Sequence, residues 1–124
     1  MLSFARVGCW LVLGWGWMPQ AALAHAHLLG SEPPANAVIA QAPQQLRLKF
    51  SEPVEKHFSR VQVQTDKELL VLPANSLQWD AAGKSLQIQL PAHAAATNYQ
   101  VQWSLLAKDG HPGKGRLNFK VKPQ

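Results

Sequence analysis

The sequence predicts an all-β protein, a small immunoglobulin-like Greek-key barrel or sandwich of about seven strands. Three observations indicate this fold class. Apolar and polar residues alternate with a period of two along most of the chain, which is typical of strands with one buried face. Clusters of Pro, Gly, Asn and Asp separate these runs. The chain has 124 residues, which is room for one domain.

Strands are expected where the alternation is clearest. Leu46, Leu48 and Phe50, for example, alternate with Arg47 and Lys49. Five clear runs predict strands, and three weaker runs predict further short ones. The clear runs are 46–50, 61–64, 86–90, 99–105 and 117–121, and the weaker ones are 28–32, 68–72 and 77–79.

Turn-forming residues fill the gaps between these strands. They cluster at 33–36, 51–53, 80–83 and 109–113, where their backbone preferences favour reversal of the chain. One alanine-rich stretch, residues 93–97, is expected to hold a helical turn. A scaffold of this kind carries its function in loops and termini, so candidate functional residues are sought there.

Residues 1–24 are predicted to be a secretory signal peptide. Arg6 supplies the positive charge, an apolar run ends at Met18, and an Ala-Leu-Ala cleavage motif ends at Ala24. The apolar run is shorter than the roughly 20 residues that a helix needs to span a bilayer. Cleavage after Ala24 would leave one exported domain, residues 25–124.

Composition limits the chemistry of this domain. Cys9 and the two methionines, Met1 and Met18, would leave with the signal peptide, so any metal must be held by nitrogen and oxygen. The net charge of +5 accompanies only 15% charged residues, so we expect no nucleic-acid partner. The sequence has no nucleophile elbow, phosphate-binding loop or His-Glu-x-x-His motif, and no enzyme is predicted.

Metal-ligating residues occur at the predicted new N-terminus and in a late loop. Cleavage would let His25 offer its α-amine and ring nitrogen to one metal. In an extended segment the side chains of His25 and His27 would point to the same side, so His27 could lie near the same ion. Asp109 and His111 follow a clear strand and are separated by Gly110. An amine, two imidazoles and a carboxylate suit Cu(II), whereas Cu(I) prefers sulfur.

Simpler interpretations apply to single residues. A lone histidine is usually a surface or helper residue, and His57 and His93 are assigned to that class because neither has a partner at ligand spacing. The Asp-Gly-His sequence at 109–111 would, by itself, be an ordinary turn. The coincidence of this loop with an N-terminal histidine is what favours a metal site.

Two modes of Cu(II) binding are open at the N-terminus. In the first, His25 binds together with the late loop, and His27 is a neighbour or an auxiliary ligand. In the second, residues 25–27 chelate the metal alone, through the amine, two deprotonated backbone amides and the His27 ring. We favour the first mode because a preorganised site avoids deprotonating amides and ordering a free terminus.

Several longer stretches form a specific combination. They are His-Ala-His-Leu at 25–28, Glu-Pro-Pro-Ala-Asn-Ala at 32–37, Leu-Arg-Leu-Lys-Phe-Ser-Glu-Pro-Val at 46–54, and a Tyr-x-Val-x-Trp strand followed by Asp-x-His at 99–111. With this combination the chain resembles the CopC family of periplasmic copper-binding proteins, in particular its YobA-like members. The resemblance covers essentially all of residues 25–124.

The resemblance implies a Greek-key β-barrel that binds one Cu(II) per chain through His25, Asp109 and His111. It also implies a role in copper homeostasis or resistance, as a monomer that sequesters copper or delivers it to a CopD-like inner-membrane transporter. Some family members bind Cu(I) through a Met-rich loop. Residues 54–73 contain no Met, so a Cu(II)-only type is expected.

Two other functions are kept as alternatives. A copper-dependent oxidative enzyme, such as a polysaccharide oxygenase, also uses an N-terminal histidine and a second histidine on copper. Asp109 would occupy a position that such enzymes leave open for oxygen. The other alternative is a β-sandwich interaction module without a metal.

Overall fold

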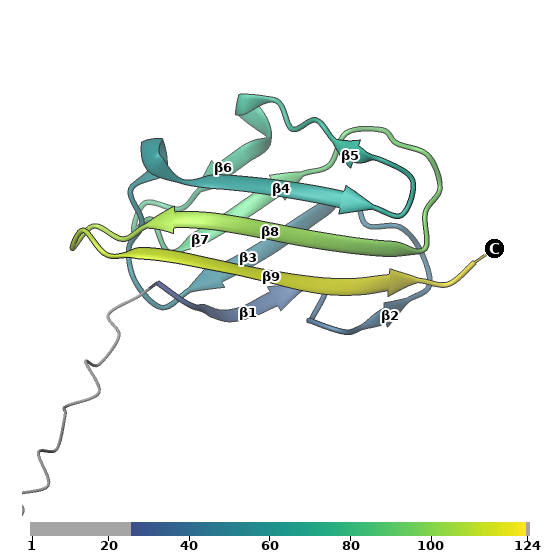
Figure 1. Cartoon of the computed structure of the whole chain (residues 1–124), viewed down its shortest axis with the longest axis horizontal. Coiled ribbons are helices and arrows are strands. Elements are labelled where there is room, and N and C mark those ends of the chain that lie inside the picture. The colour runs from purple at the N-terminus through teal and green to yellow at the C-terminus, as the bar shows by residue number, and fades with distance from the viewer. Residues whose placement is uncertain (1–25, 124) are drawn as a thin grey trace, which may run out of the picture.

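The computed structural model describes residues 26–123, which form two β-sheets packed face to face (Figure 1). The predicted signal peptide and His25 lie outside the described residues. The predicted all-β sandwich is confirmed, because strands dominate and the helices are two single 3-10 turns, η1 (Lys56–Phe58) and η2 (Ala74–Ser76). In the described part of the chain, no helix is long and apolar enough to cross a membrane.

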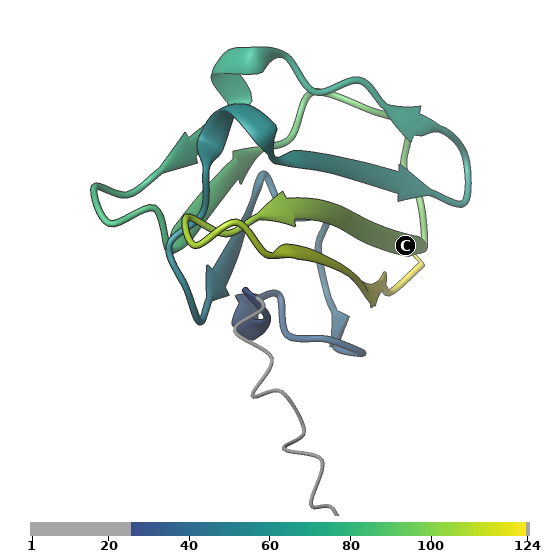
Figure 2. The same ribbon diagram turned by 60° about the vertical axis from the view of Figure 1, so that its left-hand side comes forward.

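The first sheet has four strands in the order β1-β3-β7-β6, and the second has five in the order β2-β9-β8-β4-β5. Neighbouring strands are antiparallel, except that β2 runs parallel to β9. The two layers can be followed in Figures 1 and 2. The strands of the first sheet are β1 (Leu28–Glu32), β3 (Gln45–Phe50), β6 (Leu77–Trp79) and β7 (Ser85–Gln89), and those of the second are β2 (Val38–Ile39), β4 (Arg60–Thr65), β5 (Leu69–Leu70), β8 (Asn98–Leu106) and β9 (Pro112–Val121).

Every predicted strand overlaps an observed one, and the structure adds two features. Strand β2 has two residues, which is too short for alternation to show in the sequence. Strand β9 begins at Pro112, earlier than predicted. Gly113 and Gly115 take the inward positions at its start, so the sequence there lacks the apolar side chains that mark a strand.

The predicted helical turn at 93–97 is wrong. The structure has neither helix nor strand in this stretch, and its backbone amides bond to distant side chains. The Ala94 amide donates to the Glu68 carboxylate at 3.3 Å, and the Thr97 amide donates to Asp66 Oδ1 at 3.0 Å. These tertiary hydrogen bonds satisfy the amides that a local turn would otherwise satisfy.

The core fills the space between the sheets and is organised around aromatic rings. Phe50 of β3 lies edge-on to Trp103 of β8, with 5.8 Å between ring centroids, and 6.0 Å from Trp79 of β6. Tyr99 of β8 stacks on Phe119 of β9 at 4.9 Å. Because these contacts connect both sheets, the inward-facing apolar side chains of the alternating strands form a single buried layer.

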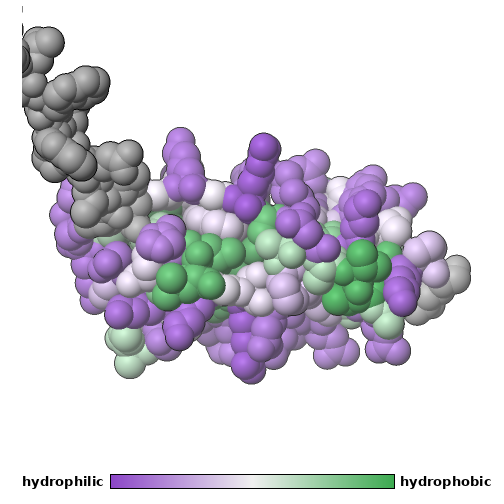
Figure 3. Space-filling model, turned by 90° about the horizontal axis from the view of Figure 1, so that it is seen from below, coloured by the Kyte–Doolittle hydropathy of each residue, from purple (hydrophilic) through white to green (hydrophobic). Residues whose placement is uncertain are grey.

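The side of the sandwich along β1 and β2 exposes some apolar side chains. Seen from below, it shows separate apolar patches among polar side chains (Figure 3). Leu29 in β1 and Val38 in β2 are each 58% exposed. Scattered apolar exposure of this extent is ordinary for a folded domain.

The close packing of the Trp103 indole against Gly115 allows a test of the core. A Cβ atom added to Gly115 would lie 2.4 Å from the Trp103 indole, and Trp103 is buried. Gly115→Ala should therefore lower the free energy of unfolding by about 1–3 kcal/mol, as overpacking of a core does. Urea unfolding measures this change. Gly30→Ala is the control, since nothing lies within 4 Å of the added atom there, and equal unfolding midpoints for the two variants would contradict the prediction.

Candidate metal centre

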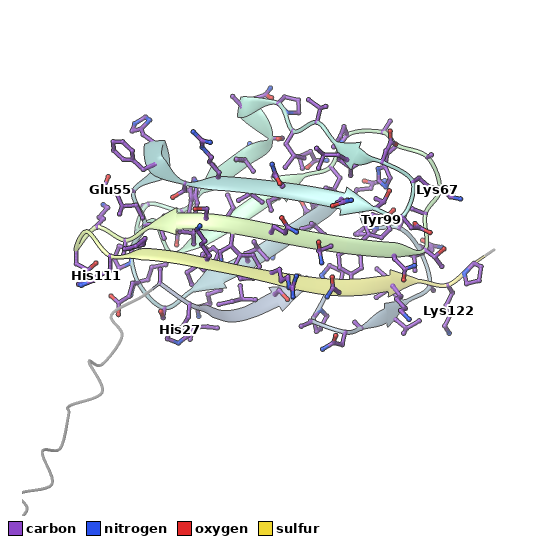
Figure 4. All side chains as sticks on the ribbon, in the orientation of Figure 1. His27, Glu55, Lys67, Tyr99, His111 and Lys122 are labelled. Atoms are coloured by element: carbon purple, nitrogen blue, oxygen red, sulfur yellow. The ribbon has the colours of Figure 1, made fainter. Side chains whose placement is uncertain are left out.

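Three segments meet at one end of the sandwich: the start of the described chain, the loop after β3, and the turn between β8 and β9. Backbone hydrogen bonds join them. The Ser51 amide donates to the His27 carbonyl at 2.9 Å, and the Lys108 amide donates to the Pro53 carbonyl at 2.9 Å. The labelled His27 and His111 lie at this end of the molecule (Figure 4).

The turn between β8 and β9 is a tight hairpin loop. The Ala107 amide donates to the His111 carbonyl at 2.9 Å, and the Gly110 amide donates to the Ala107 carbonyl at 2.9 Å. Gly110 has a φ of 94°, which glycine adopts at little cost and which short hairpin loops require at this position. The turn therefore holds Asp109 and His111 on a rigid support.

Asp109 and His111 are in direct contact. Asp109 Oδ2 lies 3.1 Å from His111 Nδ1, and the His111 backbone amide donates to Asp109 Oδ1 at 3.0 Å. The separation of Oδ2 from Nδ1 is one that two neighbouring ligands of a small ion can have, so an ion that replaces a proton between these atoms could bind both groups. A carboxylate has about four lone-pair sites, so these two contacts do not use up its capacity as a ligand.

Both side chains are accessible to an incoming ion. The His111 side chain is 56% exposed and that of Asp109 is 42% exposed. The pair thus combines a fixed geometry with an open approach, which a site that takes up and releases a metal requires.

His27 lies at the same end but is held by Ser51. Its backbone amide donates to Ser51 Oγ at 3.0 Å, and its Nδ1 lies 3.0 Å from the same hydroxyl oxygen. With the bond from the Ser51 amide to the His27 carbonyl, three polar atoms of His27 contact Ser51. These contacts orient the ring and occupy two of the nitrogen atoms that a peptide chelator would use.

Ala26 lies against the start of β9. A Cβ atom added to Gly113 would be 2.8 Å from the Ala26 carbonyl oxygen and 3.9 Å from its nitrogen. Ala26 is also buried, at 3% exposure. Glycine at position 113 therefore permits the N-terminal segment to pack two residues away from His111.

The structure brings together part of the predicted ligand set. Asp109 and His111 are adjacent, and His27 is at the same end with its ring on Ser51. His25 lies outside the described residues. Among residues 26–123, no group of three or more His, Cys, Asp or Glu side chains is arranged to hold a metal.

The residues assigned to surface or helper roles are found elsewhere. His57 is exposed on η1. His93 Nδ1 lies 2.8 Å from the Pro91 carbonyl oxygen, and its Nε2 lies 2.6 Å from the Tyr99 hydroxyl. Burial, together with the charge of Asp66, raises the pKa of Tyr99, so the hydroxyl stays protonated and donates to His93.

Sequence reasoning did not find Ser51 or Gly113. Ser51 was expected only as part of a turn, and Gly113 only as a turn residue. Their importance comes from contacts with residues distant in the chain. The pairing of β1 with β3 brings Ser51 to His27, and the packing of the two sheets brings Gly113 to Ala26. Residue type and spacing carry no signal for such contacts.

Comparison with known proteins identifies the family. The model of the CopC domain matches residues 28–122. The chain belongs to the CopC family. Protein YobA of Escherichia coli is 39% identical over 101 residues, which are 80% of each chain. Copper resistance protein C of Xanthomonas campestris pv. juglandis is 28% identical over 128 residues, covering 98% of this chain and 100% of that protein.

A further relative is larger than this chain. Copper transport protein CutJ of Bacillus subtilis is 26% identical over 112 residues, which are 84% of this chain and 19% of CutJ. The CopC domain is therefore also found as a part of a longer protein.

Crystal structures of CopC proteins share the fold. CopC from Methylosinus trichosporium has a TM-score of 0.70 and 26% identity, covering 81% of this chain and 96% of that one. PcoC, a methionine-rich copper resistance protein from Escherichia coli, has a TM-score of 0.65 and 28% identity, covering 80% and 100%. These matches agree with the two-sheet architecture described above.

The contact between Ala26 and Gly113 can be tested in the CopC domain without a metal. Gly113→Ala should push the Ala26 carbonyl away, because its added carbon would meet backbone atoms that cannot rotate aside. The Ser51 amide, which donates to His27, should then exchange its hydrogen at least about tenfold faster, as locally opened segments do. Gly30→Ala is the matched control, and unchanged exchange at Ser51 in the Gly113 variant would refute the contact.

Proposed function

We propose that this CopC-family chain is exported, loses residues 1–24, and binds one Cu(II) per molecule in the periplasm. The ligands are the amine and ring of His25, the Asp109 carboxylate and the His111 ring, with His27 as a neighbour or auxiliary ligand. The single observation that carries the proposal is the contact of Asp109 with His111 on a rigid, exposed turn.

The position of Ala26 supports the participation of His25. Residue 25 is joined to the Ala26 nitrogen, which lies against Gly113, two residues from His111. Successive α-carbons are about 3.8 Å apart, so the N-terminal amine and the ring of residue 25 are within reach of the Asp109–His111 turn. These two side chains alone offer too few ligands for a stable copper site, and His25 would supply the remainder.

The choice of metal follows from the donor atoms. Imidazole, amine and carboxylate suit Cu(II), and the general affinity order places Cu(II) above Zn(II) at such a site. No Cys or Met follows Met18 in the sequence, so the soft ligands that favour Cu(I) are absent from the exported chain. This distinguishes the chain from PcoC, which is described as methionine-rich.

The geometry of His27 favours the loop-assisted mode over the peptide chelator. The chelator would bind the metal through the His27 amide nitrogen and Nδ1, because only Nδ1 closes a six-membered ring with that amide. Both atoms are engaged by Ser51. Chelation would have to break these bonds and deprotonate the amide, whereas the loop-assisted mode leaves them intact.

The biological role that fits this site is sequestration or delivery of copper. The relatives named for copper resistance and copper transport support a role in copper homeostasis. A monomer with an exposed site is suited to exchange copper with a CopD-like membrane transporter. No reaction is assigned, because Asp109 would take the position that an oxidative copper enzyme leaves open for oxygen.

The ligand assignment predicts unequal effects of two substitutions. Loss of a residue that only orients a metal ligand typically weakens metal binding by roughly 10–100-fold. His111→Ala should weaken Cu(II) binding by more than this, because it removes an imidazole ligand. Asp109→Ala should weaken binding less, by about 10–100-fold, because the imidazole ligands remain. Titration against a competing chelator, with EPR of the bound copper, measures both effects.

His57→Ala is the matched control for these variants. It removes an exposed histidine outside the proposed site and should leave Cu(II) affinity unchanged. All three variants should keep the unfolding midpoint of the parent, because the replaced side chains lie outside the core. Unchanged Cu(II) affinity of the His111 variant would exclude the proposed site.

The N-terminus provides the test that separates the two binding modes. One extra alanine before His25 converts the amine into an amide and should cripple both modes, because each needs the free amine. In the loop-assisted mode, His27→Ala should lower the Cu(II) affinity by less than about tenfold. In the peptide-chelator mode the same substitution would abolish binding. If the extended protein binds Cu(II) as tightly as the processed one, the metal is bound elsewhere.

A further inference from the structure

The outer face of the five-stranded sheet is basic and has no acidic residue in its long strands. Strands β4, β8 and β9 contain no Asp or Glu, but they carry Arg60, Lys114, Arg116 and Lys120. This face is turned to the viewer in Figure 1. The acidic residues of the described chain lie on β1 and in loops: Glu32, Glu52, Glu55, Asp66, Glu68, Asp80 and Asp109.

The strand register turns part of this face into a trough. Arg60 and Lys114 flank Ser104, which lies between them on the central strand β8. In the next row of the same face, Gln62 and Arg116 flank Gln102. The central Ser104 and Gln102 are half-buried, whereas the flanking cations are exposed. We call this depression the basic trough; its volume is about 570 Å³ and the side chains named here line it.

The cations of the basic trough are not neutralised within the fold. No ion pair among residues 26–123 involves Arg60, Lys114 or Arg116. The outer face of the four-stranded sheet differs, because the depression there contains Glu32 and Asp80 beside Arg47 and Lys49. On the five-stranded sheet, Asp66 lines a separate depression towards the opposite end of the strands, so the unbalanced positive charge is confined to the basic trough.

We propose that the basic trough and the sheet face around it dock onto the phosphate-bearing surface of an anionic lipid bilayer. The chemistry of the face favours a lipid surface over a protein partner. Specific protein interfaces have an apolar centre surrounded by a polar rim. The centre of this face is instead polar, with Arg, Lys, Gln, Asn and Ser, and its apolar residues lie at the ends and edges: Leu106, Pro112, Leu69 and Val38. Clustered Lys and Arg, by contrast, bind anionic headgroups through charge alone.

Docking in this way would orient the candidate metal centre. Lys114 pairs with Ser104, only two register positions from Leu106 and Pro112, where the turn bearing Asp109 and His111 begins. The turn would lie beside the membrane, where copper could pass to a transporter. This consequence rests on the proposed copper function, but the docking itself does not.

Vesicle binding tests the proposal. The exported protein, with its processed N-terminus checked by mass spectrometry, is sedimented with vesicles of phosphatidylglycerol and phosphatidylcholine or of phosphatidylcholine alone, without copper. We expect binding to the anionic vesicles only. Raising the salt from about 20 to about 200 mM should weaken it strongly, because the Debye length falls well below its low-salt value.

Two triple variants with the same change in net charge locate the surface. Arg60→Gln, Lys114→Gln and Arg116→Gln together should reduce partitioning onto anionic vesicles by about 10–100-fold, because each cation contributes separately near the surface. Arg47→Gln, Lys49→Gln and Lys84→Gln remove equal charge from the other sheet and should reduce it by less than about threefold. The single variant Lys114→Glu, at an exposed position, keeps the test valid if a triple variant folds poorly.

Three results would overturn the docking proposal. The first is absence of binding to anionic vesicles at low salt, and the second is an equal loss of binding in the two triple variants. The third is release from the vesicles by inorganic phosphate at an ionic strength at which the protein stays bound in sodium chloride. The last result would indicate a small-anion site instead of a membrane surface. Cu(II) affinity of the Arg60, Lys114 and Arg116 variant, measured without vesicles, should equal that of the parent. The docking proposal can therefore fail while the copper proposal stands.

Discussion

The antiparallel pairing of β8 with β9 is the interaction on which the other features of this CopC-family chain depend. Nine residue pairs join the two strands, from Asn98 opposite Lys120 to Leu106 opposite Pro112. Their inward side chains supply Tyr99, Trp103 and Phe119 to the aromatic core, and their outward side chains form much of the basic face. Because side chains alternate along a strand, one ladder serves the core and the surface at once.

The same hairpin ends in the turn that presents Asp109 and His111. The turn closes a hairpin of nine residue pairs, and in it the Asp109 carboxylate contacts both the imidazole and the backbone amide of His111. In the proposed copper site their exposure would be useful, since an incoming ion would meet side chains that are already oriented. Rigidity comes from the sheet, and accessibility comes from the position of the turn at its end.

Close approach of the N-terminal segment depends on small residues at the start of β9. Gly113 accepts the Ala26 backbone, and Gly115 accepts the indole of Trp103. A side chain at either position would push the partner outward. The segment that leads to His25 and the ring that fills the core are thus packed against neighbouring residues of one strand, which connects the stability of the sandwich to the shape of the candidate metal centre.

Local patterns in the sequence predicted most of the strands and one contact of the candidate metal centre. Alternation such as that of Leu46, Leu48 and Phe50 predicts a strand because its period is a property of the strand itself. Asp109 and His111 could be paired in advance because a glycine turn separates them by only two positions. The same alternation predicted the all-β fold class, the CopC resemblance agreed with it, and the structure confirms it.

Tertiary structure alone decided which distant residues meet. The helical turn expected at 93–97 is replaced by bonds to Asp66 and Glu68, and the hold of Ser51 on His27 depends on the register of β1 with β3. The basic trough likewise exists only because β4 and β9 place Arg60 and Lys114 on either side of Ser104. Local periodicity states which face of a strand a residue occupies, but the register between strands, which determines its neighbours, is set by the packing of the whole core.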